Sequence, residues 1–297
     1  MVEIRRILCP IDFSDTSQHA LEHAVAIAKW YESKITALHV INPALLIEPP
    51  ILVGEFRGGG APTETDRESP RNQLESWLKP AEAVGVKTDL VFDEGNPTGS
   101  IVDWSASLPA DLVVIGTHGR GGFERFLLGS VTEKVLRKVT CPTLTVPPPA
   151  VTPVMLPYKR LLSPVDFSET SLAALRFAMS IAQESDAHLT VLHVVDWADE
   201  LLTERFDTKA FHGVVEHEAQ TRLDGLVTDE MRNWCEPETK IESGKPYRRI
   251  LETADRDHAD LIVMGVRGRN ALDLMLFGST ANHVVRRATC PVLTLRQ

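Results

Sequence analysis

The sequence predicts an α/β protein built from two tandem doubly wound domains, each with a five-stranded parallel sheet covered by helices on both faces. Strand-like and helix-like segments alternate along the chain. The strand-like segments are nearly all apolar, as expected of parallel strands buried on both faces. The same order of elements occurs twice within 297 residues, a length that allows each copy its own core.

The first copy begins with a short apolar strand over residues 5–11, followed by a helix from Ser14 to Ser33. Apolar side chains recur along this helix at helical spacing, and Ser14 or Asp15 is available as its N-cap. The rest of the copy is predicted as strand Lys34–Ile41, a helix that Ser69 and Pro70 start and that reaches Val84, strand Lys87–Phe92, helix Pro97–Leu108, strand Asp111–Gly116, helix Ser130–Val139 and strand Pro142–Val146.

The repeat is visible in the residues themselves. The segment ILCPIDFSDTS over residues 7–17 recurs as LLSPVDFSETS over residues 161–171, which pairs Asp12 with Asp166. Further along, Gly116 pairs with Gly265, Gly129-Ser130 with Gly278-Ser279, and Cys141-Pro142 with Cys290-Pro291. A proline-rich stretch separates the copies, because prolines disfavour both helix and central strand. The predicted domains are residues 1–149 and 157–297, joined by a linker over residues 150–156.

Composition narrows the classes of function. No apolar run approaches the roughly 20 residues of a membrane helix, so no membrane span is expected. The N-terminus leads directly into a strand without the apolar region of a secretory signal, which predicts a cytoplasmic location. A net charge of −10 disfavours nucleic acid as a partner. The four scattered cysteines show no metal-binding spacing and are interpreted as reduced, mostly buried thiols.

A glycine-rich loop follows the predicted strand Asp111–Gly116 and leads into a helix at Ser130. Glycines let the backbone approach a phosphate closely, and a helix N-terminus offers unpaired N–H groups to an anion. The second copy keeps the spacing Gly-x-x-Gly, nine residues, Gly-Ser although most intervening residues differ, which turn formation alone does not require. The loops therefore predict anion binding.

Some of these residues have two interpretations. Ser130 begins the capping-box pattern Ser130-Val-Thr-Glu133, so its hydroxyl can cap the helix, contact a ligand, or do both. Asp12 and Asp166 can cap the helices that follow them, but Ser14 and Ser168 are available for that purpose, which favours ligand contact for the aspartates.

With these motifs in place, both copies resemble universal stress protein domains of the ATP-binding kind, over essentially the whole chain. The resemblance implies a Rossmann-like, adenine nucleotide alpha hydrolase-like fold. It also implies that the aspartate meets the adenosine end of ATP, the tail of the second strand lies against the base, and the glycine loop holds ribose and phosphates. Carried over, the binding residues are Asp12, Val40, Gly116, Gly119, Gly129, Ser130 and Val131 in the first copy, and Asp166, Val194, Gly265, Gly268, Gly278, Ser279 and Thr280 in the second.

The arginines and histidines near the loops give weaker evidence for a binding or catalytic role than the glycines and aspartates do. Arg120 and Arg269 follow the second glycine of each loop, where a guanidinium can pair with phosphate oxygens or remain a solvated surface group. His118 has Arg267 as its counterpart, so no shared general base is expected. His39 and His193 are interpreted as structural or crevice-lining groups. No catalytic residue and no protein-bound metal is predicted.

The predicted function is that of an ATP-binding universal stress protein that regulates stress adaptation, with Mg²⁺ held through the phosphates. The alternatives are a slow ATPase or phosphoryl-transfer enzyme, which would need positioned groups around the γ-phosphate, and an assembly protein with only one functional nucleotide site. The resemblance further implies that the closing strands pair internally as a pseudo-dimer, on which a homodimer is built. The second loop lacks the extra glycines of the first and carries Asp273, so its site is expected to be weaker or altered.

Overall fold

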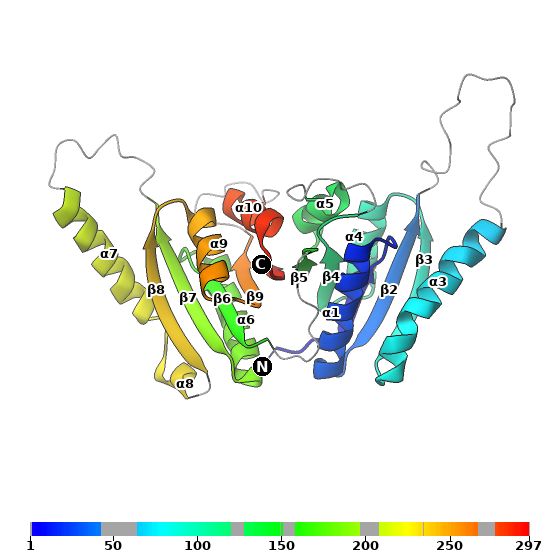
Figure 1. Ribbon diagram of the computed structural model, residues 1–297, viewed down its shortest axis with the longest axis horizontal. Coiled ribbons are helices and arrows are strands. Elements are labelled where there is room, and N and C mark those ends of the chain that lie inside the picture. The colour runs from blue at the N-terminus through cyan, green and yellow to red at the C-terminus, as the bar shows by residue number, and fades with distance from the viewer. Residues whose placement is uncertain are drawn as a thin grey trace, which may run out of the picture.

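A computed structural model describes residues 2–42, 64–119, 128–148, 150, 158–196, 208–233, 235–266 and 277–296. Strands and helices alternate through both halves of the chain (Figure 1). The first half contains β1 (Arg6–Pro10), α1 (Asp15–Tyr31), β2 (Lys34–Ile41), α3 (Glu64–Ala83), β3 (Lys87–Glu94), α4 (Pro97–Ser107), β4 (Leu112–Gly116), α5 (Ser130–Lys138) and β5 (Thr143–Val146). The second half contains β6 (Arg160–Pro164), α6 (Glu169–Ser185), β7 (His188–Val195), α7 (Thr208–Asp224), α8 (Asp229–Arg232), β8 (Glu236–Ser243), α9 (Pro246–Arg256), β9 (Leu261–Gly265), α10 (Ser279–Arg287) and β10 (Val292–Leu295).

All the strands belong to one ten-stranded sheet in the order β3-β2-β1-β4-β5-β10-β9-β6-β7-β8. Strand pairs within each half are parallel, and β5 pairs with β10 antiparallel at the centre. The predicted pair of doubly wound domains, each with five parallel strands, is confirmed. The predicted internal pairing of the closing strands is confirmed as well.

Helices cover both faces of this sheet because successive strand residues point to opposite sides. On β9, Leu261 and Val263 belong to the core under α1, α3, α6 and α7, whereas Ile262 and Met264 belong to the core under α9 and α10. The helices α4 and α5 cover the matching part of the first domain. In Figure 1 the two halves lie side by side, with α3 and α7 at opposite ends of the sheet. The first of these cores runs through both halves, so the domains share one hydrophobic layer.

The central seam is held by buried side chains as well as by backbone bonds. The hydroxyl of Thr145 donates to the carbonyl of Val292 over 3.1 Å, and the hydroxyl of Thr294 donates to the carbonyl of Thr143 over 3.1 Å. Both threonines are buried, so these two hydrogen bonds satisfy the hydroxyl groups where water has no access. The seam is thus a packed interface between the domains.

An ion-pair network joins α5 and α10 across the seam. The carboxylate of Glu133 lies 2.8 Å from the guanidinium of Arg137 and 3.1 Å from that of Arg286. Hydrogen bonding to Arg137, aided by the charge of Arg286, lowers the pKa of the Glu133 carboxyl below its ordinary value. The α5 helix of the first domain is therefore tied to α10 of the second.

The α3 helix differs from the sequence expectation at its start. It begins at Glu64, and Pro70 lies inside it instead of starting it. Proline lacks the N–H that would bond to the preceding turn, which is why the sequence indicated a helix start there. Leu74 and Leu78 bury fully against the sheet core, and this packing holds the helix in place beyond what local propensity indicates. A short extra helix, α8, was also not expected.

The four cysteines are free thiols, and all but the half-buried Cys141 are buried, as predicted. Burial raises the pKa of Cys141 to about 11 and that of Cys290 to about 12, so both remain protonated at neutral pH. Within the described ranges, no helix is long and apolar enough to cross a membrane.

His23 makes the stability of the domain interface depend on pH. It is 1% exposed on α1, and its Nδ1 lies 3.3 Å from the hydroxyl of Tyr158 in the second domain. Burial, and to a lesser extent His19, lowers the pKa of His23 from 6.5 to about 4. The unfolded chain therefore takes up this proton at a higher pH than the folded chain, and the folded state loses stability as the pH falls from 6.5 towards 4.

We expect this loss to reach about 3 kcal/mol, from roughly 1.4 kcal/mol for each pKa unit. Urea unfolding at a series of pH values measures it. In His23→Phe the slope of stability against pH should become shallower, whereas His217→Gln, at an exposed position on α7, should keep it. Equal slopes in the wild-type protein and His23→Phe would contradict the assignment.

Candidate functional site

The candidate site lies where the winding of each sheet reverses. In the first domain β1 pairs with both β2 and β4, so the chain adds strands to one side of β1 and then to the other. In doubly wound sheets such a reversal opens a crevice at the carboxyl ends of the strands. Asp12 follows β1 and Gly116 ends β4, so both lie at this crevice. In the second domain β6 and β9 place Asp166 and Gly265 in the same way.

The carboxylate of Asp12 is held by the residue that caps the next helix. Its Oδ1 accepts hydrogen bonds from the amide of Ser14 over 3.0 Å and from the Ser14 hydroxyl over 2.6 Å. The N-cap of α1 is Ser14, whose hydroxyl oxygen accepts from the amide of Ser17. Ser14 therefore does the capping, as the sequence suggested, and Asp12 is left to face the crevice.

The second copy repeats this arrangement closely. The Oδ1 of Asp166 accepts from the amide of Ser168 over 3.0 Å and from its hydroxyl over 2.5 Å. Ser168 is the N-cap of α6. Because two sequences that differ at neighbouring positions form the same contacts, the carboxylate orientation is a property of the shared Asp-Phe-Ser motif.

The residue between aspartate and cap adopts a left-handed backbone. Phe13 and Phe167 both have φ of 62°, a conformation that costs a non-glycine residue about 1–3 kcal/mol. The Phe13 ring packs on His39 with 4.7 Å between centroids, and the Phe167 ring packs on His193 with 4.6 Å. These ring contacts help to hold the strained turn in both domains.

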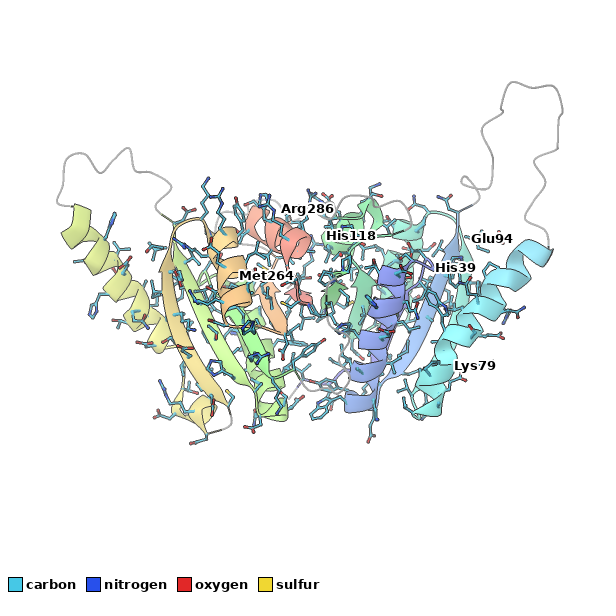
Figure 2. All side chains as sticks on the ribbon, in the orientation of Figure 1. His39, Lys79, Glu94, His118, Met264 and Arg286 are labelled. Carbon is cyan, nitrogen blue, oxygen red and sulfur yellow. The ribbon has the colours of Figure 1, made fainter. Side chains whose placement is uncertain are left out.

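His39 also contacts the backbone of this turn. Its Nδ1 lies 2.8 Å from the carbonyl oxygen of Ile11, and His193 Nδ1 lies 2.7 Å from that of Val165. A carbonyl oxygen only accepts, so Nδ1 carries the hydrogen and donates it. Each histidine thus fixes the residue immediately before the aspartate, in line with the structural role expected of it. Figure 2 labels His39 in the first half of the molecule.

Gly116 allows the start of α1 to approach the end of β4. A Cβ at this position would lie 2.9 Å from Thr16 Cγ2 and 3.0 Å from the Thr16 carbonyl oxygen. At Gly265 it would lie 2.8 Å from the carbonyl carbon of Thr170. A side chain at these distances would force the backbone to shift. Glycine is therefore needed in both copies for the helix start to approach the strand end this closely.

Gly119 is in contact with Asp12. A Cβ built on Gly119 would lie 2.6 Å from Asp12 Oδ2. The first glycine motif and the aspartate, far apart in the sequence, therefore meet in the crevice. The counterpart in the second copy, Gly268, lies outside the described residues, as do Arg120 and Arg269.

The base of each loop is closed by the third glycine. The amide of Gly129 donates to the carbonyl of Thr117 over 2.8 Å, and that of Gly278 donates to Val266 over 2.8 Å. In the first domain the Thr132 hydroxyl also donates to the Gly116 carbonyl over 2.8 Å. Alanine at position 281 takes the place of this threonine in the second domain, so that side-chain bond is absent there.

The helix after the loop begins differently from the capping-box interpretation. Ser130 is the first helical residue, Gly129 is the cap, and no side-chain capping bond is formed. The Glu133 carboxylate bonds to arginines instead of the helix start. Of the interpretations open for Ser130, helix capping is the one that the structure excludes, because the loop closure through Gly129 sets the start of the helix one residue earlier. Ser130 is exposed, as is Ser279 at the start of α10.

Apolar residues line the remaining part of the predicted site. Val40, near the end of β2, and Val131, at the start of α5, are half-buried and pack against the same core cluster. In the second domain, Val194 packs against the corresponding core, and Thr280 is half-buried.

The half-buried His118 lies with Nδ1 2.9 Å from the hydroxyl of Thr117. Among the residues that the structure describes, no group of three His, Cys, Asp or Glu could hold a metal ion.

Three contributors escaped the sequence analysis: Thr16 beneath Gly116, Phe13 with its left-handed backbone, and Thr132 at the loop base. A signal for two of them was present, because Phe13 and Thr16 recur as Phe167 and Thr170 inside the repeated segment. Neither phenylalanine nor threonine is by itself typical of a binding site, so their recurrence in the repeat does not identify them as part of one.

These features define a class: a tandem pair of doubly wound α/β domains, each with an aspartate and glycine-loop crevice at its strand reversal. The sequence model described as the Universal stress protein family matches residues 3–147 and 157–296. The chain belongs to the universal stress protein family, as a member with two domains.

Individual relatives agree with this assignment. The universal stress protein Rv2005c of Mycobacterium tuberculosis is 30% identical over 285 residues, covering 89% of this chain and 87% of that protein. MJ0531 of Methanocaldococcus jannaschii is 36% identical over 145 residues, covering 49% of this chain and 83% of that protein. The crystal structure of a universal stress protein from Archaeoglobus fulgidus superposes with a TM-score of 0.70 at 26% identity, covering 100% of this chain and 97% of that one.

Substitution of Gly116 tests the close approach at the crevice floor. In Gly116→Ala the added methyl group meets the backbone of Thr16, so we expect a loss of about 1–3 kcal/mol in unfolding free energy, the ordinary cost of overpacking. Chemical unfolding followed by circular dichroism measures this loss. Gly99→Ala is the matched control, because nothing lies within 4 Å of a Cβ there. Equal stability of the two variants would refute the contact.

Proposed function

We propose that this protein binds ATP, with the crevice of the first domain as its principal site, and that it acts as a nucleotide-responsive regulator in stress adaptation. The observation that carries the proposal is the meeting of Asp12 and Gly119 at the strand reversal. A carboxylate accepts hydrogen bonds from hydroxyl groups such as those of ribose. A glycine beside it leaves room for a ligand to approach the backbone.

The residues around this contact fit the parts of a nucleotide. The apolar side of the crevice, with half-buried Val40 and Val131, suits a base. The first turn of α5, beginning at Ser130, offers backbone N–H groups of the kind that bind phosphate. Gly116 lets the start of α1 approach the end of β4, and Gly119 lets the loop backbone lie beside the Asp12 carboxylate, so both glycines shape the crevice around the ligand. ATP would thus be held by Asp12 at its adenosine end and by the glycine loop at its phosphates.

Mg²⁺ would accompany ATP through the phosphates. The described residues supply no acidic or histidine cluster for it, and phosphate oxygens with water are ligands that Mg²⁺ prefers. The chain's part would be to bind and orient the nucleotide through the residues named above.

The second domain would bind nucleotide more weakly. It keeps Asp166, Gly265 and the closed loop base at Gly278. It lacks the hydroxyl of Thr132, and its loop has Asn270 and Ala271 where the first loop has Gly121 and Gly122, so its backbone has less freedom to follow a phosphate. The acidic residue of its loop, Asp273, has Glu124 as its counterpart, so charge does not distinguish the two loops. Unequal sites would allow the protein to respond over a wider range of nucleotide concentration than two equal ones.

A regulatory role is favoured over an enzymatic one because the two crevices share binding features more than catalytic ones. They have in common the aspartate, its serine partner and the glycines. His118, the histidine of the first loop, has Arg267 at the matching position. A cytoplasmic location and a homodimer of these pseudo-dimers are parts of the same proposal. Light scattering with and without ATP would test the homodimer.

The aspartates provide the direct test of nucleotide binding. In Asp12→Ala, loss of hydrogen bonds to a charged group should weaken the tighter ATP site about tenfold to a hundredfold. Asp166→Ala should affect the weaker site alone. Calorimetry with Mg-ATP and mass spectrometry of nucleotide released from purified protein measure affinity and stoichiometry. Asp103→Ala, at an exposed position on α4, is the control. No bound nucleotide and no heat of binding in the wild-type protein would refute the proposal.

Gly119→Ala separates binding from stability. Its methyl group would meet Asp12 Oδ2, the end of a side chain that can rotate, so the carboxylate should move while the fold stays intact. We expect weaker ATP binding, by about tenfold, with a melting temperature close to that of the wild-type protein. Phosphate release from ATP should be measured on the same samples. Release well above background that falls with ATP affinity in this variant would favour the slow ATPase instead.

A further inference from the structure

Cations gather around one tyrosine of the second domain, on α9 and α10, which pack side by side (Figure 1). The Tyr247 ring stacks on His283 of α10 with 4.4 Å between centroids. The guanidinium of Arg248 lies 5.8 Å from the centre of the Tyr247 ring, and that of Arg287 lies 5.6 Å from it. Arg248 Nε also donates to the Tyr247 hydroxyl over 3.1 Å. Together with Lys245, which precedes α9, these four residues form what we call the basic patch.

The long cationic side chains of the basic patch are exposed and lack a partner of opposite charge. Within the described part of the chain, three of them form no ion pair: Lys245, Arg248 and Arg287. Other arginines on the same helices do, since Arg249 lies 2.9 Å from Glu252 and Arg286 lies 3.1 Å from Glu133.

The charges of the basic patch act on the tyrosine at its centre. The hydrogen bond from Arg248, with the charges of Arg287 and Lys245, lowers the pKa of the Tyr247 hydroxyl below its ordinary value. The whole chain has a net charge of −10, so the basic patch is a local reversal of its sign.

These charges are placed where they destabilise the helix that carries them. Lys245 is the N-cap of α9 and forms no side-chain capping bond. Its counterpart in the first domain, Asn96, accepts from the amides of Thr98 and Gly99 at the start of α4. A helix N-terminus carries partial positive charge, so the cations of Lys245 and Arg248 are unfavourable there. Because the first domain builds the matching helix with Asn96 and Gly99 at these two positions, the fold does not require the cations.

The basic patch is separate from the crevice of the second domain. That crevice lies between β6 and β9, whereas Lys245 follows β8 at the edge of the sheet. On α10, His283 and Arg287 lie about one and two turns beyond Ser279, where the helix starts. The stacked rings and the bond from Arg248 hold these groups in place, so less side-chain freedom is lost when a partner binds.

We propose that the basic patch binds a short segment of a partner protein that is rich in aspartate and glutamate. Guanidinium groups pair with carboxylates through two parallel hydrogen bonds, and arginine clusters are a recurring means of recognising acidic motifs. The cations occupy the start of α9 and the last turn of α10, an extent that suits a few carboxylates. A nucleic acid gains affinity from a longer row of cations along its backbone, and the net charge of −10 repels so dense a polyanion.

The test is fluorescence anisotropy of fluorescein-labelled decaglutamate titrated with the full-length protein. We expect saturable binding that weakens as salt is added. Lys245→Asn combined with Arg248→Gln should weaken binding about tenfold or more, with the fold retained by circular dichroism because asparagine can cap α9. Arg287→Gln, on the other helix, should weaken binding in the same direction. The matched control combines Lys29→Gln with Arg176→Gln, which removes two exposed cations from α1 and α6 and should leave binding unchanged.

Two further probes complete the test. A labelled glycine–serine peptide of the same length should not bind, and equal binding of it would overturn the proposal. So would the absence of saturable decaglutamate binding, an unchanged affinity in both patch variants, or an equal loss in the control variant, which would mean that binding follows net charge alone. Labelled oligothymidine of the same length should bind more weakly than decaglutamate. Tighter binding of the oligothymidine that falls in the patch variants would assign the surface to nucleic acid instead.

Discussion

The antiparallel pairing of β5 with β10 is the interaction on which the rest of this structure depends. A four-residue strand at the edge of each five-stranded sheet would leave its backbone groups unpaired, and each domain covers the edge of the other. The buried threonine hydroxyls add side-chain bonds at the same place. This pairing fuses two sheets into one and joins the hydrophobic layer beneath α1 and α6.

Within each domain, the crevice depends on how closely a helix start can approach a strand end. Gly116 and Gly265 allow contact with Thr16 and Thr170 that no other residue would permit. A serine then caps the helix and orients the neighbouring aspartate, while phenylalanine and histidine stabilise the strained turn. The same contacts form twice in sequences that have diverged elsewhere. Their recurrence shows that both copies build the turn before the helix in the same way, although a turn can be built in many ways.

The two halves are alike in architecture and unlike in surface chemistry. The first loop is rich in glycine and its base is braced by Thr132, whereas the second lacks the extra glycines and that hydroxyl. His23, in the middle of α1, contacts Tyr158 of the second domain, outside both crevices. A duplicated domain can thus keep one binding geometry in two copies while the interface between them acquires its own properties.

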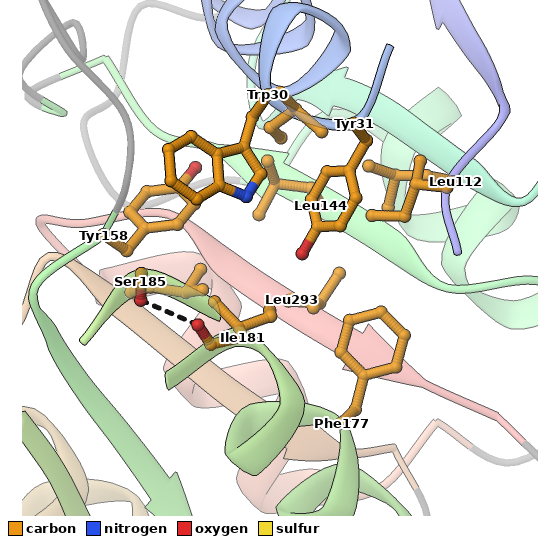
Figure 3. A pocket seen from close by; sticks show the side chains of 12 residues that line it. Trp30, Tyr31, Leu112, Leu144, Tyr158, Phe177, Ile181, Ser185 and Leu293 are labelled. Atoms are coloured by element: carbon orange, nitrogen blue, oxygen red, sulfur yellow. Dashed lines mark hydrogen bonds between the residues drawn. The ribbon is translucent and has the colours of Figure 1, made fainter. Parts of the chain in front are cut away.

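Sequence alone determined the duplication, the doubly wound fold and the serine caps, because these rest on local periodicity and on short motifs that recur. Only the tertiary structure decided that α3 continues through Pro70, that Gly129 instead of Ser130 caps α5, and that Gly119 touches Asp12. It alone revealed that Trp30 and Tyr31 of the first domain gather with Tyr158 and Phe177 of the second (Figure 3). Such features depend on distances between segments remote in sequence, which neither periodicity nor spacing encodes.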